Sequence, residues 1–149
     1  EFIPDSSGVL VGLRLETRRG DILKGLIEGV TFYLRECIES LPAAGIEIND
    51  LCVVGGGSKS DTWVQLSADI LGRPCVRPSV KEAGILGAAI IAGTGCGLFP
   101  SLEAGVEAMV KLDRVFEPDQ AMHARYQGRF EKYQQLWPLM REYVLGLAG

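Results

Sequence analysis

Apolar residues recur at helical spacing in two long segments of the chain. In the first segment, an apolar stripe runs from Leu23 to Leu41 at intervals of three and four residues, and Pro42 follows directly. This spacing places the stripe on one face of an amphipathic helix, which we expect Asp21 to cap and the sheet to cover. The polar face is then expected to meet solvent, and its charged members are Lys24, Glu28, Arg35 and Glu39.

The second segment predicts a long helix from Pro118–Asp119 to about Leu147. Its apolar and aromatic residues keep intervals of three and four throughout, which is typical of a continuous core-facing stripe. Pro138 lies inside this stripe, so we expect a kink or an interruption near Leu136. The single histidine, His123, lies on the polar side and is expected to be solvated.

Shorter apolar runs predict strands at residues 9–15, 51–54 and 74–78. Helices alternate with these strands along the chain. The order of strand, helix, strand, helix, strand and helix favours an α/β domain with parallel strand pairing.

The segment 83–92 predicts a helix that is apolar all round and therefore buried on several sides. Ser79 and Glu82 have the spacing of a capping box at its start, so Ser79→Ala is expected to cost about 1 kcal/mol. Gly84 and Gly87 lower the helix propensity, and close backbone packing would compensate. For Gly84 we expect packing on the sheet, whereas for Gly87 packing and ligand contact both remain open.

Three glycines, Gly55, Gly56 and Gly57, join the second predicted strand to the next helix, and Ser58 with Asp61 predicts the start of that helix. Unpaired N–H groups and the positive end of the helix dipole converge at such a turn and favour an anion. A tight turn without a ligand explains the same residues equally well. The common nucleotide fingerprints do not match, because the third glycine of Gly-x-Gly-x-x-Gly is replaced by Ser60 and the Walker A spacing is not met.

Composition limits the function further. The 149 residues suit one domain, 1–149, and 47% hydrophobic with 23% charged residues is an ordinary globular composition. A net charge of −4 argues against nucleic acid or an anionic membrane as a partner. The four cysteines are widely spaced and predict buried free thiols in a reducing cytoplasm, not a zinc site. The absence of an initiator Met suggests a piece of a longer protein.

Several segments in this order resemble the C-terminal domain of FGGY-family carbohydrate kinases, and the xylulokinase-like branch most of all. They are residues 53–63, Gln65, 68–69, 72–74, 82–89 and 114–118. The resemblance implies a ribonuclease-H-like domain of the actin/hexokinase type, here incomplete at its N-terminus, with a long C-terminal helix. In this family, ATP and sugar bind in the cleft between two such domains.

The resemblance also implies a nucleotide site. The second and third glycines would lie against the ribose and the α-phosphate, and Asp61 occupies a position, often Asn in relatives, that contacts adenine. An aspartate can accept a hydrogen bond from the adenine amino group but cannot donate one. Gly87 would lie on the helix that flanks the adenine pocket. The implied cofactor-binding set is Gly55, Gly56, Gly57, Ser58, Asp61 and Gly87.

By the same resemblance, the phosphate-binding hairpin, the sugar site and the general base lie in parts of the parent that this chain lacks. The parent is expected to phosphorylate a ketopentose or a related sugar with ATP and Mg²⁺, and the metal would not be held by residues of this chain. We assign no catalytic residue here and expect the chain alone to be inactive. Residues 9–15 would then be an unpaired strand edge, which favours self-association or pairing with the missing N-terminal sugar-binding domain.

Two other functions stay open. An NADP-binding Rossmann module could use Arg77, at the end of the strand after the glycine turn, as the partner of a 2′-phosphate. A non-catalytic nucleotide-binding or assembly domain would keep the fold without the reaction. Preference for ADP over NADP would favour the kinase, and no nucleotide binding would favour the assembly domain.

Overall fold

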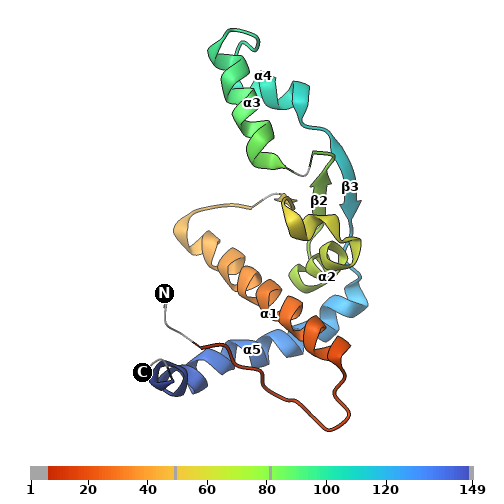
Figure 1. Ribbon diagram of the computed structural model, residues 1–149, viewed down its shortest axis with the longest axis vertical. Helices are drawn as coiled ribbons and strands as arrows, with labels where there is room; N and C mark the ends of the chain where they lie inside the picture. The colour runs from red at the N-terminus through yellow and green to blue at the C-terminus, as the bar shows by residue number, and fades with distance from the viewer. Residues whose placement is uncertain (1–6, 49, 81, 148–149) are drawn as a thin grey trace.

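A three-stranded sheet in the order β1–β2–β3 is the centre of the fold (Figure 1). The computed structural model describes residues 7–48, 50–80 and 82–147. The elements, in chain order, are α1 (Arg19–Ser40), the 3-10 helix η1 (Leu41–Ala44), β1 (Leu51–Cys52), the 3-10 helix η2 (Gly56–Lys59), α2 (Asp61–Leu71), β2 (Cys75–Pro78), α3 (Ala83–Gly95), α4 (Leu102–Met109), β3 (Leu112–Phe116) and α5 (Gln120–Gly146).

Strands β1 and β2 are parallel, which confirms the predicted pairing, whereas β3 runs antiparallel to β2. The first strand is shorter than the sequence predicted, although the Val53 N–H extends its ladder by donating to the Val76 carbonyl at 2.8 Å. An apolar run of this kind is typical of a buried strand, but β1 lies at the sheet edge and leaves Cys52 and Val54 exposed.

Helix α2 lies between the sheet and the two longest helices, and it contributes to both core clusters. Toward the helices, Ile70 packs with Phe32 of α1 and Phe130 of α5. Toward the sheet, Ala68 packs with buried residues of β2 and β3. The C-terminus of α2 is fixed by Gly72 in the left-handed conformation (φ +65°), a frequent helix ending.

Helix α1 ends before Pro42 as predicted, but its buried face is the opposite of the expected one. Glu28 and Arg35 are buried, while Leu23 and Val30 of the apolar stripe are 50% and 61% exposed. Polar partners explain this inversion. Glu28 accepts a hydrogen bond from the Tyr126 hydroxyl at 2.9 Å, and the Arg35 guanidinium lies 4.1 Å from the centre of the Phe130 ring.

The predicted long helix is confirmed as α5, with Asp119 as its N-cap. Its stripe is buried at Tyr126, Phe130 and Val144. The helix continues through Pro138, so the expected interruption is absent, and a kink there stays a prediction. His123 is not a solvated side chain either: its Nδ1 lies 2.9 Å from the Asp69 carbonyl oxygen, and its ring covers Gly72.

Residues 9–15 were predicted as a strand, but they form irregular chain that leads into a turn. Two residues of this segment, Val9 and Val11, line a cavity of about 210 Å³ whose other walls include Tyr133 and Trp137. Apolar side chains of α5 therefore offer the segment a packing surface, and its backbone pairs with no strand in the described part of the chain.

Helix α3 is mostly exposed, which contradicts the expected burial. It packs against α4, and only Ile90 and Gly93 are buried among its described residues. Ser79 does not cap it, because the Ser79 hydroxyl donates to the Lys111 carbonyl at 3.0 Å and the N-cap residue is Glu82. The cost predicted for Ser79→Ala thus loses its structural basis.

The four cysteines are free thiols, as predicted, but only Cys75 is buried. Burial raises the pKa of its thiol to about 11. Cys37 lies on the exposed side of α1, Cys52 lies on the edge strand, and Cys96 follows α3 at the exposed end of the molecule.

Candidate functional site

The glycine turn after β1 consists of Gly55, Gly56 and Gly57, and the last two of these belong to η2. Gly55 has φ +82° and ψ −166°, a backbone conformation that is strained for a residue with a side chain, and η2 begins directly after it. The Ser58 hydroxyl donates to the Gly55 carbonyl at 2.7 Å and closes the turn. Ser58 is therefore not the predicted helix cap. Ser60 has that role, since its Oγ accepts the Trp63 N–H at 3.3 Å.

Space beside the glycines decides whether a ligand could approach. A Cβ added at Gly56 would meet no described atom within 4 Å, whereas one at Gly57 would contact the Trp63 ring at 3.5 Å. The first N–H groups of a helical turn have no partner within it, so those at the start of η2 can meet a ligand. The turn thus combines open space with hydrogen-bond donors.

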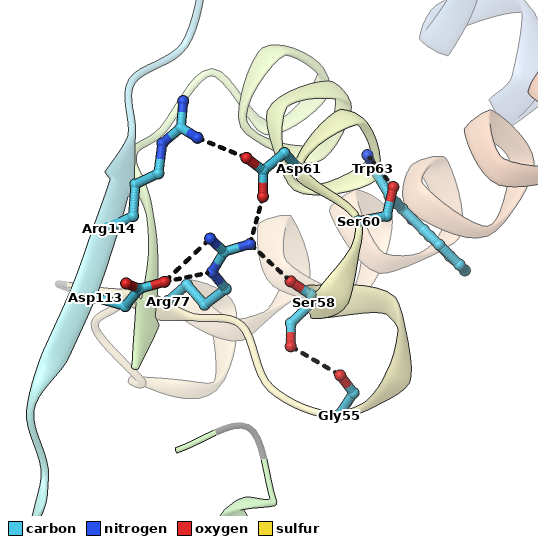
Figure 2. Close-up of polar contacts among 8 residues, drawn as sticks. All are labelled: Gly55, Ser58, Ser60, Asp61, Trp63, Arg77, Asp113 and Arg114. Atoms are coloured by element: carbon cyan, nitrogen blue, oxygen red, sulfur yellow. Dashed lines mark hydrogen bonds and ion pairs between the residues drawn. The ribbon is translucent and has the colours of Figure 1, made fainter. Parts of the chain in front are cut away.

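Asp61, the first residue of α2, is held by two arginines on neighbouring strands (Figure 2). Its Oδ1 lies 2.6 Å from the Arg77 Nη1, and its Oδ2 lies 2.6 Å from the Arg114 Nη1. The two arginines are paired residues in the register of β2 and β3. The sheet therefore fixes the position of the carboxylate at the helix N-terminus.

Arg77 connects this carboxylate to the glycine turn and to β3. It is 7% exposed, and it donates to the Ser58 carbonyl at 3.0 Å and to Asp113 Oδ2 at 3.1 Å. The hydrogen bond to Asp61, followed by that to Asp113 and the charges of both acids, raises the pKa of Arg77 in spite of its burial. Because these acceptors engage its guanidinium, Arg77 does not fit the role of a 2′-phosphate partner in an NADP site.

Two hollows flank the turn. Gly57 and Ser58 line one of about 290 Å³ together with Trp63 and Leu34. Asp61 lines another of about 430 Å³ between α2, β3 and α5. Gly57 and Ser58 therefore border a different hollow from the one that Asp61 borders.

Gly87 lies on α3, where an added Cβ would meet no described atom within 4 Å. The expected packing of Gly84 on the sheet is wrong for the same reason, since the position is equally open. An exposed ion pair of 3.3 Å between Lys59 and Glu82 links the glycine turn to the start of α3.

Sequence reasoning missed the network around Asp61, although it singled out Arg77 for another role. Asp113 and Arg114 lie 36 and 37 residues after Arg77, in a segment for which the sequence analysis predicted no strand. The missing information was the strand register that pairs Arg77 with Arg114. The available signal in the sequence was the pair of charged residues, Asp113 and Arg114, within the otherwise apolar segment that forms β3.

Among the described residues, no group of three or more His, Cys, Asp or Glu side chains could hold a metal ion. The donor set present does not fit Mg²⁺, and we derive no step through a metal from this chain. In the same ranges, none of the helices is both long and apolar enough to cross a membrane.

The strand, glycine turn and helix N-terminus, followed by a long C-terminal helix, define an α/β domain. The chain belongs to the FGGY family of carbohydrate kinases, since the model of the family's C-terminal domain matches residues 2–96. This confirms the resemblance and the fold class expected from the sequence.

The relatives are longer proteins. A xylulose kinase of Staphylococcus epidermidis is 34% identical over 140 residues, which are 94% of this chain and 28% of that kinase. Among solved structures, a ligand-bound xylulose kinase of Lactobacillus acidophilus has a TM-score of 0.82 at 25% identity, over 96% of this chain and 29% of that one. A Plasmodium falciparum glycerol kinase with ADP has a TM-score of 0.69 at 28% identity, over 95% and 27%.

Proposed function

We propose that this chain is the nucleotide-binding C-terminal portion of an ATP-dependent sugar kinase. The observation that carries the proposal is the glycine turn, where Gly55 has a positive φ and an added Cβ at Gly56 would meet no described atom within 4 Å. Backbone N–H groups and the N-terminus of α2 favour an anion at such a turn. The similarity to a glycerol kinase solved with ADP supports this assignment.

In the proposed complex, Gly56 and Gly57 lie against the ribose and the α-phosphate, and Gly55 and Ser58 shape the turn. Asp61 accepts a hydrogen bond from the adenine amino group. Gly87 belongs to the opposite wall, on α3. Since Gly57 and Ser58 border one hollow and Asp61 borders another, we expect weak binding that improves when the rest of the kinase closes the cleft.

Phosphoryl transfer requires a bound triphosphate, a positioned acceptor hydroxyl and a base within hydrogen-bond reach. The carboxylates beside the turn, Asp61 and Asp113, are both held by Arg77 and are poor candidates for that base. The rest of the parent kinase would supply the base and the sugar site, with a ketopentose as the proposed substrate and Mg²⁺ carried by ATP. The free cysteines fit the reducing cytoplasm that we expect for it.

Nucleotide titration of the 149-residue chain tests the proposal. Wild-type protein should bind ADP in preference to NADP and show no sugar-dependent ATP turnover. Gly56→Val should abolish ADP binding without unfolding the chain, because the new side chain points into open space in a conformation that valine can adopt. Gly128→Val on α5, where a Cβ also meets no described atom, is the matched control.

Three experimental results would contradict the proposed function. A folded Gly56→Val protein that binds ADP like the wild type would exclude the turn as the site. A wild-type chain that binds no nucleotide would favour the assembly domain instead. Turnover by the chain alone would show that a base is present here after all.

A further inference from the structure

Arg77 binds groups on two sides of its planar guanidinium (Figure 2). On one side, Nε and Nη2 lie 3.1 and 3.0 Å from Asp113 Oδ2 on β3. On the other side, Nη1 donates to the Ser58 carbonyl at 3.0 Å and to Asp61 at 2.6 Å. The N–H donors of a guanidinium have a fixed geometry, so the contact with Asp113 sets the direction of Nη1 toward the glycine turn.

Ser58 extends this constraint to the glycines. Its carbonyl accepts from Arg77, and its hydroxyl donates to the Gly55 carbonyl at 2.7 Å. Gly56 and Gly57 lie between these two bonded residues in the chain, and they have no side chain that restricts their backbone dihedrals. The direction of their N–H groups therefore depends on the contacts of Ser58.

Burial makes the guanidinium sensitive to the loss of an acceptor. Arg77 is buried, and its guanidinium lies 5.1 Å from the centre of the Phe116 ring. A buried cation is stable only where its hydrogen bonds are satisfied. Without Asp113, the Nε and Nη2 donors would reach water by a turn of the guanidinium, at the expense of the bond to Ser58.

We propose that Arg77 is a positioning residue that, oriented by Asp113, holds the glycine turn through the Ser58 carbonyl in the conformation that binds a nucleoside diphosphate. The inference rests on the proposed function, because it assumes that the turn receives the nucleotide. It goes further by making nucleotide affinity depend on Asp113, a half-exposed residue of β3 that is linked to the turn through Arg77.

Asp113→Ala tests the inference without a change in the turn itself. The turn should lose the hydrogen bond from Arg77, so the affinity of the 149-residue chain for ADP should fall by about three- to tenfold. Asp113→Asn should retain part of the affinity, because its amide oxygen still accepts a hydrogen bond. Both affinities are measured by ADP titration of folded protein.

Glu39→Ala is the matched control, because Arg35 is held like Arg77 at the other end of α2. Arg35 is equally buried, and it pairs through Nε with a half-exposed acid, Glu39, at 2.7 Å. It also donates to a backbone carbonyl, that of Ile70, at 3.1 Å and covers a phenylalanine ring. The control should leave the affinity for ADP unchanged.

Trp63 reports on the turn in the absence of a ligand, since its ring lies 3.5 Å from the position of a Cβ added at Gly57. Trp137→Phe leaves Trp63 as the single tryptophan of the chain. In that background, Asp113→Ala should shift the fluorescence emission, and Glu39→Ala should not.

The outcomes separate this inference from the proposed function. A wild-type chain that binds no ADP would overturn both together. A wild-type chain that binds ADP, with the same affinity after Asp113→Ala, would overturn the inference alone. Unchanged emission of Trp63 after Asp113→Ala would overturn it too, because the turn would then not depend on Asp113.

Discussion

Gly72→Ala should destabilise the chain more than an ordinary glycine substitution at the end of a helix. The backbone at Gly72 has φ +65°, and an added Cβ would lie 2.4 Å from His123 Cε1. A left-handed conformation costs a non-glycine residue about 1–2 kcal/mol. The imidazole must also move, which breaks its 2.9 Å hydrogen bond with the Asp69 carbonyl and adds about 1 kcal/mol.

We therefore expect a total loss of about 2–3 kcal/mol in the free energy of unfolding. Urea denaturation measures this loss from the shift of the midpoint multiplied by the slope. In a His123→Ala background, the steric conflict is absent and only the backbone strain remains, so the same substitution should cost about 1–2 kcal/mol. Equal costs in the two backgrounds would refute the contact between His123 and the end of α2.

Two further predictions concern a buried thiol and an exposed helix face. Burial raises the pKa of Cys75 from 9.0 to about 11 in the folded chain. The contribution of the protonated thiol to the free energy of unfolding is therefore fully present below pH 9 and is lost as the pH rises toward 11. Urea midpoints should fall over that range, and less so for Cys75→Ala. The apolar stripe of α1 should cause self-association, and Val30→Lys should lower the mass measured by light scattering. A monomeric wild-type chain would contradict this second prediction.

Local patterns predicted the element types well and their burial poorly. Helices α1 and α5 begin and end near the predicted residues, because caps, prolines and spacing act within the segment. The edge position of β1 and the exposure of α3 depend on which elements pack beside them. That information is not contained in the segments themselves.

Capping illustrates the same limit at the scale of single side chains. Ser58 and Ser79 both have the sequence spacing of a cap, yet their hydroxyls donate to backbone carbonyls. The first bond closes the glycine turn, and the second ties the chain after β2 to Lys111, 32 residues away. Spacing cannot distinguish a cap from these alternatives, because the competing acceptors are placed by the turn and by the fold.

The candidate site shows which part of a binding surface a sequence can reveal. The glycine turn and the start of α2 are contiguous, so the motif located them. The second set of contacts to Asp61 comes from strands whose register depends on tertiary pairing. The sequence therefore suggested Arg77 as a ligand partner. In the structure, its guanidinium instead donates hydrogen bonds to three groups of the chain itself.

Helix α1 shows how a correct pattern can predict the wrong buried face. Its apolar stripe exists, but α5 offers a hydroxyl, an amide and an aromatic ring, and these favour Glu28 and Arg35 on the inner side. A buried charge is tolerated when its hydrogen bonds are satisfied, and in the described residues every buried side-chain polar atom has a partner. Both faces of α1 are thus suited to burial, one by polar contacts and the other by apolar side chains. A helix of this kind fits the interior of a larger protein. This agrees with our proposal that the chain is one portion of a kinase, since it matches 28% of its xylulose kinase relative.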